Sequence, residues 1–157
     1  MNITELLQQY RERRDSRPHW DEYFSAIATV VASRSTCGRR AVGAVLVDKN
    51  KRIIGTGYNG VARGLEHCTR IACPGALHKS GEGLDECEAI HAEANALVNC
   101  TDHMAIETIY CTSAPCIGCT KLLMNTTCNR IVFIEDYPKN GRLLWEKLGR
   151  EWEKLHG

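Results

Sequence analysis

The stretch that decides the fold is AVGAVLV at residues 41–47, followed by the turn DKNK at 48–51 and by IIGTGY at 53–58. The first stretch is too short and too rich in valine for a helix of its own, and the second returns to the same strand-like character. Because the polar residues between them favour a reversal of the chain, we expect a β-hairpin that ends in the loop Tyr58-Asn59-Gly60.

Helical and strand-like patterns alternate along the rest of the chain. Apolar spacing predicts helices over 3–10, 20–33, 88–99, 116–124 and 143–148, and strands over 108–112 and 130–134. Helices that alternate with strands after a hairpin are typical of a layered α/β protein. We therefore predict a three-layer α/β/α sandwich with a mixed central sheet.

The length of 157 residues suits one compact domain. The apolar share of 43% and the charged share of 25% are ordinary for a globular protein. We expect a single domain over 1–157, with a helical extension at 1–18 and a cysteine-rich insertion at 61–87. The insertion has no clear periodicity, and a loop of this length is usually functional or held by something other than a core.

The balance of charge restricts the partners. The formal net charge is +1, so there is no general electrostatic reason to expect a polyanion such as tRNA or duplex DNA. A small nucleotide is compatible with this balance, because one phosphate needs only a local cluster of donors. No run of about 18 apolar residues and no signal peptide is present, so we expect a cytoplasmic protein without a membrane partner.

Nine cysteines are many for a cytosolic chain of this size. Their odd number, without a secretion signal, argues against a framework of disulfides. Reduced cysteines in such numbers favour thiolate ligands for a metal, while the others are small buried side chains.

Two short motifs carry the chemistry: HAE at 91–93 and PCIGC at 115–119, each expected at the start of a helix. A Cys-x-x-Cys pair at a helix N-terminus directs two thiolates to the same side, and the helix dipole favours their deprotonated form. With one imidazole added, such ligands leave a tetrahedral zinc ion one open position, as in catalytic sites. Zinc lowers the pKa of its bound water from ~16 to about 7, so hydroxide is available at neutral pH.

Glu93 follows the expected ligand His91 by two residues, so it lies off that ligand's helix face but is able to reach the open position and move protons. The order H-x-E followed by P-C-x-x-C is the known signature of zinc-dependent nucleobase deaminases, in which the glutamate is the general acid and base. Two alternatives stay open: a redox role for the cysteine pair, or a structural zinc with Cys111 or Cys128 as its fourth ligand.

Together with other segments, these motifs make the chain resemble the deoxycytidylate deaminase family, which has the cytidine deaminase-like fold. The resemblance runs from about Trp20 to Tyr137. It implies a sheet between helices and a catalytic zinc on His91, Cys116 and Cys119. The matching segments are Ser35-Thr36-Cys37 with Arg39, residues 42–47, 57–60, 91–96 and 113–119, and Tyr137.

The resemblance also implies roles for single residues. Glu93 would deprotonate the zinc-bound water, protonate N3 of cytosine and, after hydroxide attacks C4, pass the proton to the departing ammonia. Asn59 would bind the sugar or the pyrimidine edge, and Tyr137 would lie near the nucleotide. The other candidate contacts are Ala92 and Ser113 for the substrate, and Arg39 and Arg63 for its phosphate.

The insertion suggests a second metal site. Its cysteines are plausible ligands of a closed zinc site that would hold a segment without a core, and some members of the resembled family carry a second zinc near this insertion. His67 or His78 is able to replace one ligand, and the alternative is a set of unligated thiols. The first choice of ligands is Cys37, Cys68, Cys73 and Cys87.

We expect hydrolytic deamination of dCMP to dUMP with release of ammonia, with dCTP as a further substrate to consider. The resemblance implies a homo-oligomer, often a hexamer, that is regulated by dCTP and dTTP, with Mg²⁺ accompanying the nucleotide effector.

A tRNA adenosine deaminase would have a shorter connection before the HAE motif and a more basic surface. A nucleoside deaminase would use cysteine in place of His91. A non-catalytic zinc module would have no use for Glu93 beside an open position.

Overall fold

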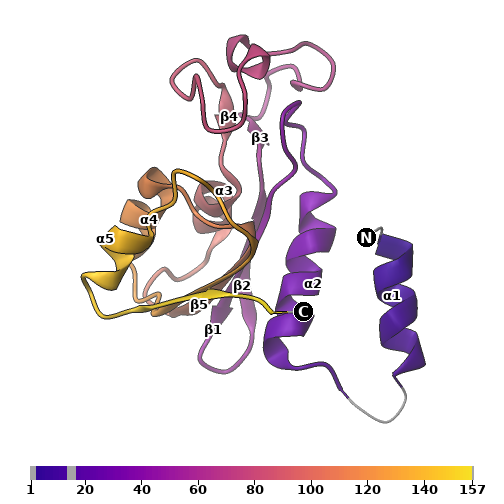
Figure 1. Cartoon of the computed structure of the whole chain (residues 1–157), viewed down its shortest axis with the longest axis vertical. Coiled ribbons are helices and arrows are strands. Elements are labelled where there is room, and N and C mark those ends of the chain that lie inside the picture. Colours follow the sequence, from indigo (N-terminus) through magenta and orange to yellow (C-terminus); the bar gives the residue numbers. More distant parts are fainter. Residues whose placement is uncertain (1–2, 14–16, 157) are drawn as a thin grey trace.

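The computed structural model describes residues 3–13 and 17–156 and is built around a five-stranded sheet with the order β2-β1-β5-β6-β7 (Figure 1). β1 pairs antiparallel with β2 and with β5, whereas β5, β6 and β7 run parallel to one another. The sheet is therefore mixed, as the sequence predicts, and the expected hairpin is β1 and β2. The strand bounds are β1 Gly43–Asp48, β2 Ile53–Tyr58, β5 Ile106–Ser113, β6 Arg130–Glu135 and β7 Glu151–Lys154.

Alternation along β1 separates two cores, because successive side chains of a strand point to opposite faces. Ala44 and Leu46 belong to the larger core, which includes residues of α3, α4 and α5. Val45 and Val47 belong to the smaller core, which they share with residues of α2. Helices thus cover both faces of the sheet, which confirms the α/β sandwich (Figure 1). The helices are α2 Trp20–Ala32, α3 Ala92–Asn99, α4 Ile117–Met124 and α5 Arg142–Glu146.

The N-terminal helix α1, Ile3–Glu12, lies beside α2 on the side away from the sheet (Figure 1). It forms where amphipathic spacing predicts it, and its contacts with α2 include a bond from the Tyr10 hydroxyl to the carbonyl of Glu22 at 3.3 Å. Arg13 also pairs with the Glu22 carboxylate at 2.9 Å. Within the described residues, no helix has the length and apolar character needed to cross a membrane.

The start of α3 and the end of α5 differ from the sequence prediction. The helix expected from residue 88 begins at Ala92, because Ala89–Ile90 forms β4, which pairs with β3 at Gly60–Val61. The last helix ends at Glu146 rather than at residue 148, and the chain then returns through Gly149, whose φ of +67° suits glycine. The edge strand β7 that follows was not predicted.

The segment between β3 and β4 projects beyond one end of the sheet (Figure 1). It contains a short 3₁₀ helix, Pro74–Leu77, and is otherwise made of turns. The absence of periodicity in the sequence is thus matched by a segment without long regular elements.

A half-buried ionic network ties α2 to three strands. Asp21, at the start of α2, accepts two bonds of 2.7 Å from Arg130 of β6 and one of 2.8 Å from the hydroxyl of Tyr110 of β5. Arg130 also binds Glu153 of β7 at 2.6 and 3.0 Å. The hydrogen bonds from Arg130 are the main cause that lowers the pKa of Asp21.

We predict that Asp21→Asn lowers the free energy of unfolding by about 2 kcal/mol at pH 7, because a charged hydrogen-bond acceptor is lost. A carboxyl whose pKa is depressed by folding stabilises the protein above its unfolded pKa, and this contribution disappears as the pH falls through the folded value. The difference between the variants should therefore shrink in acid. Urea unfolding at a series of pH values measures it.

The matched control is Asp136→Asn, which breaks the exposed pair that Asp136 forms with Lys154 at 2.6 Å. Exposed pairs are worth ~0–1 kcal/mol, so this change should cost clearly less. Equal losses from the two substitutions would contradict the structural role given to Asp21.

Candidate active site

Helix α3 is positioned by its close approach to β2. A Cβ atom at Gly57 would lie 2.2 Å from the backbone nitrogen of Ala96 and 2.3 Å from the carbonyl oxygen of Ala92, so only glycine fits there. The helix therefore rests directly on the strand backbone, and its N-cap is His91. This contact places the HAE motif at one end of the sheet.

Helix α4 begins where β5 ends. β5 finishes at Ser113, and Cys116 is the N-cap of α4, where its sulfur accepts a bond of 3.4 Å from the N–H of Cys119. Both motifs therefore sit at helix N-termini, with His91 and Cys116 one position before their helices rather than within them.

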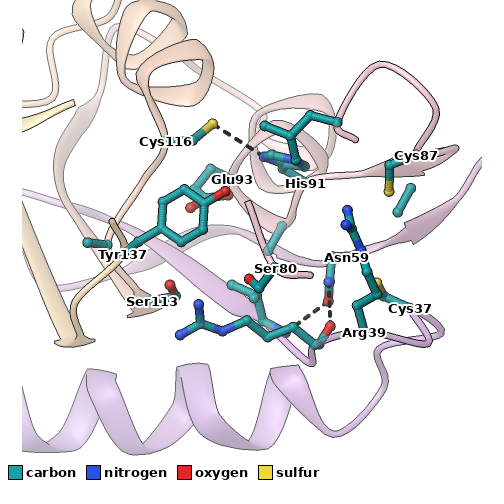
Figure 2. Close-up of a pocket in the computed structure, with 16 residues that line it drawn as sticks. Cys37, Arg39, Asn59, Ser80, Cys87, His91, Glu93, Ser113, Cys116 and Tyr137 are labelled. Carbon is teal, nitrogen blue, oxygen red and sulfur yellow. Dashed lines mark hydrogen bonds between the residues drawn. The ribbon is translucent and has the colours of Figure 1, made fainter. Parts of the chain in front are cut away.

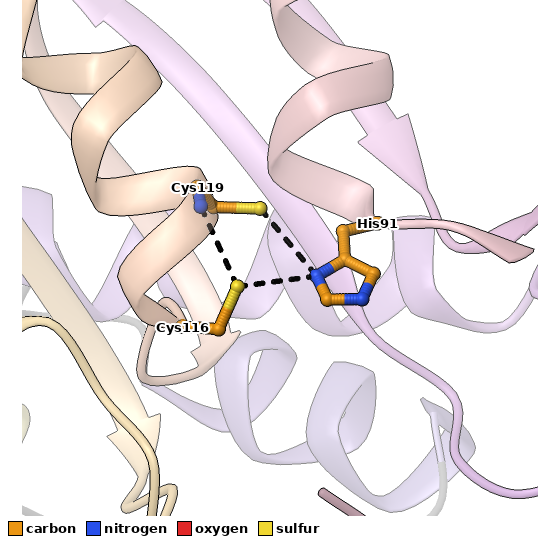
Figure 3. Close-up of side chains that lie close together, drawn as sticks. All are labelled: His91, Cys116 and Cys119. Carbon is orange, nitrogen blue, oxygen red and sulfur yellow. Dashed lines mark hydrogen bonds between the residues drawn. The ribbon is translucent and has the colours of Figure 1, made fainter. Parts of the chain in front are cut away.

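The two N-termini bring three ligating atoms together. Nδ1 of His91 lies 3.4 Å from the sulfur of Cys116 and 3.5 Å from that of Cys119 (Figure 3). The three atoms lie within 4.8 Å of one another, and among the described residues they form the one such group of His, Cys, Asp and Glu side chains. One imidazole and two thiols at this spacing are a donor set that suits zinc.

Hydrogen bonding in this group shifts the pKa values of the two thiols in opposite directions. The side chain of Cys119 donates to the sulfur of Cys116 and, with His91, lowers the pKa of Cys116 to about 4. The same bond raises the pKa of Cys119. Bonding to Cys116 also raises the pKa of His91. A thiol that ionises this readily is prepared to act as a metal ligand.

Glu93 is buried next to these ligands. With 4% of its surface exposed, it is the one acidic or basic residue that is buried among the described residues, and burial raises the pKa of its carboxyl. A buried carboxyl with a raised pKa beside a metal-binding group is typical of a residue that exchanges protons.

A pocket opens over His91 and Glu93, and labelled side chains surround it in Figure 2. Every candidate substrate contact except Arg63 lines it. Arg63 is exposed and does not line the pocket. The candidates that line it are Arg39, Asn59, Ala92, Ser113 and Tyr137.

Asn59 organises one wall of this pocket. Its Nδ2 donates to the carbonyl of Arg40 at 2.7 Å, and its Oδ1 accepts from the N–H of Val42 at 2.8 Å and from the hydroxyl of Ser35 at 2.5 Å. The amide oxygen is thus occupied by the protein, and one Nδ2 hydrogen is left for a ligand.

The pocket has lining residues that the sequence prediction missed. Arg40 lies 6.0 Å from the ring centroid of Tyr137 and pairs with Glu135 at 3.0 Å. Ser80 and Leu84 enter from the insertion. Arg40 could have been found from its place beside Arg39, between two matching segments of the sequence, whereas no pattern in the insertion indicates Ser80. The other missed residues are Val42, Ala89 and Ala114.

The four cysteines expected at a second metal site do not form a second group of closely spaced ligands within the described residues. Cys68 and Cys73 are buried, and the N–H of Cys73 donates to the sulfur of Cys68 at 3.5 Å. Cys37 and Cys87 line the pocket over His91. Backbone hydrogen bonding, from Glu88 above all, lowers the pKa of Cys73.

Comparisons with known proteins identify a family and relatives of this chain. A family model described as the cytidine and deoxycytidylate deaminase zinc-binding region matches residues 18–135. The deoxycytidylate deaminase of Mycobacterium phage D29 is 44% identical over 132 residues, which are 79% of this chain and 98% of the phage protein. That of Saccharomyces cerevisiae is 39% identical over 123 residues, or 77% of this chain and 39% of the yeast protein.

A solved structure supports the same relationship. The dCMP deaminase of cyanophage S-TIM5, in complex with dCMP and dUMP, superposes with a TM-score of 0.66 at 28% identity. The superposition covers 89% of this chain and 99% of the phage chain.

We predict that Cys119→Ala removes one zinc ion per chain, because two remaining ligands hold the metal too weakly to survive dialysis. Elemental analysis of the purified protein measures the zinc content. Cys100→Ala is the matched control, since Cys100 is also a buried free thiol but ends α3 away from the ligand group. Full zinc content in the Cys119 variant would rule out this ligand set.

Proposed function

The chain belongs to the cytidine and deoxycytidylate deaminase zinc-binding family, and from this premise we propose that it hydrolyses dCMP to dUMP and ammonia. One observation carries the proposal: buried Glu93 lies beside the group of His91, Cys116 and Cys119 at a pocket. The structure of the S-TIM5 relative with dCMP and dUMP supports the choice of substrate.

The donor set fits a catalytic zinc ion. Three protein ligands, one imidazole and two thiolates, leave the fourth position of a tetrahedral ion open. The pocket lies on the side of His91 and Cys116, which both line it. When bound there, zinc would acidify a water molecule, so that the nucleophile is available near neutral pH.

Glu93 moves the protons of the reaction. Its carboxylate takes a proton from the attacking water and delivers it to N3 of the pyrimidine, while the water oxygen bonds to C4. A second proton from the same oxygen then passes through Glu93 to the exocyclic amine, and the C4–N bond breaks. The products are the uracil carbonyl and ammonia, and the carboxylate is restored.

The walls of the pocket orient the nucleotide. We assign Asn59, through its remaining amide hydrogen, to the sugar or the pyrimidine edge. Ala92, Ser113 and Tyr137 enclose the base and sugar.

Arg40 supplies the charge for one phosphate. Its partner Glu135 is 71% exposed, so a phosphate that enters the pocket exchanges with a carboxylate held mostly in solvent. Arg39 lines the same wall, but carbonyl groups of the insertion occupy its Nη1. A guanidinium group that faces an exchangeable carboxylate, as Arg40 does, favours a mononucleotide over a nucleoside.

A second zinc ion, held by cysteines of the insertion, is also proposed. The neighbouring buried thiols of Cys68 and Cys73 and the lowered pKa of Cys73 support it. Cys37 and Cys87 complete the proposed set, which requires side-chain rearrangement. The zinc analysis of the unmodified protein decides between one and two ions per chain.

Assembly, regulation and location are proposed on the family resemblance. We propose a homo-oligomer, with a hexamer favoured, and control by dCTP and dTTP with Mg²⁺. We also propose a cytoplasmic location, since the cysteines are free thiols and a reducing cytoplasm maintains thiols in this form. The family match over 18–135 supports one deaminase domain over 1–157, with 1–18 as an extension and 61–87 as an insertion.

We predict that Glu93→Gln lowers kcat for dCMP by at least ~100-fold, because the amide has the shape of the carboxyl but transfers no proton. Ammonia release measures activity, and elemental analysis should show that zinc is retained. Glu88→Gln, which changes an exposed carboxylate five residues earlier, serves as the control. Near-normal activity of the Glu93 variant with zinc bound would refute the mechanism.

A panel of dCMP, deoxycytidine, dCTP and adenosine-containing tRNA tests the substrate. We expect dCMP to be the preferred substrate. In Arg40→Ala, the KM for dCMP should rise about tenfold or more, because a charged hydrogen bond to phosphate is lost. The KM for deoxycytidine, which has no phosphate, should change little. Glu135→Gln is the control, since it removes the competing carboxylate without removing the cation. Turnover of tRNA without turnover of any mononucleotide would overturn the substrate assignment.

A further inference from the structure

We propose that Arg39 is a positioning residue that holds residues 78–84, here called the 78–84 loop, as a wall of the substrate pocket. The inference rests on the proposed function for the identity of the ligand only. It differs from the direct phosphate contact that the sequence suggested for Arg39.

Backbone carbonyls of the loop converge on one nitrogen of Arg39. Its Nη1 donates to the carbonyl of Glu82 at 2.7 Å, to that of Lys79 at 3.0 Å and to that of His78 at 3.4 Å. Arg39 lies some forty residues before the loop, in the segment that Asn59 fixes through the carbonyl of Arg40. A rigid part of the fold thus anchors a segment of the insertion.

Apart from the bonds to Arg39, the hydrogen bonds described for the loop stay within the insertion, such as that between His78 and Glu86 at 3.2 Å. Lys79, Ser80 and Glu82 are exposed, and Leu84 is 37% exposed, so burial of apolar surface contributes little. The N–H of Glu82 bonds to the carbonyl of Lys79 at 2.9 Å, which closes a tight turn that Arg39 also binds. Segments with few buried apolar contacts open locally at low cost, so a charged donor shared by the turn carbonyls is a main restraint.

The wall formed by this loop meets the other side of the pocket at Tyr137. Gly81 is buried with φ +84°, and a Cβ atom there would lie 3.3 Å from the Tyr137 hydroxyl. Ser80 and Leu84, on either side of Gly81, line the pocket together with Tyr137. Holding the loop therefore places two lining side chains and brings its backbone against a third.

Hydrogen exchange of the whole protein, followed by mass spectrometry, tests the restraint without any need for activity. In Arg39→Ala, the amide of Glu82, which bonds to the carbonyl of Lys79, should exchange about tenfold faster or more, the factor that corresponds to one lost charge-assisted hydrogen bond. Exchange in β1 and β5 should not change. Arg39→Lys, which keeps a charged donor, should restore part of the protection.

Binding of dUMP and of deoxyuridine, measured by calorimetry, separates a loop restraint from a phosphate contact. Loss of a wall should weaken both ligands by the same factor in Arg39→Ala, whereas Arg40→Ala should weaken dUMP alone and leave loop exchange unchanged. Unchanged exchange of the Glu82 amide, or weaker binding of dUMP only, overturns the proposal. Failure of dUMP to bind the unmodified protein counts against the proposed function, and hydrogen exchange still decides the role of Arg39.

Discussion

The convergence of two helix N-termini is the constraint on which the site depends. His91 caps α3 and Cys116 caps α4, and three ligating atoms meet within 4.8 Å only if both helices begin at the same end of the sheet. The contact of α3 with β2 at Gly57 fixes one helix, and the exit of the chain from β5 fixes the other. The partial positive charge at helix N-termini favours thiolate at this point, so the fold that brings the ligands together also favours the deprotonated form of Cys116, the sulfur that caps α4.

Much of this arrangement was predictable because it depends on local patterns. The hairpin of β1 and β2, the mixed sheet and the helices on both faces follow from apolar periodicity, and the HAE and PCIGC motifs identify the atoms that meet. The starts of α3 and α4 were placed four residues and one residue too early, because the chain just before each helix is extended, in α3 as strand β4. His91 and Cys116 have extended backbone angles as N-caps, although they adjoin sequences with helical spacing.

Other features depend on tertiary contacts that leave no local pattern. β7 has only four residues, three of them charged. Its inward residue Trp152 packs against Phe133 on another strand. The network of Asp21 and Arg130 joins residues 109 positions apart. The lining by Ser80 follows from how the insertion folds back over the pocket, which periodicity does not describe.

Asn59 shows how a residue in a binding motif acts through its neighbours. Its side chain binds the hydroxyl of Ser35, the carbonyl of Arg40 and the N–H of Val42, so one amide holds the backbone of the segment that carries both arginines. The two arginines have different partners: Arg39 binds carbonyls of the insertion, and Arg40 binds the carboxylate of Glu135. Carbonyl dipoles form part of a wall, whereas an exposed carboxylate exchanges readily with another anion. Two adjacent arginines of the same charge therefore suit different tasks, because the groups that they contact differ.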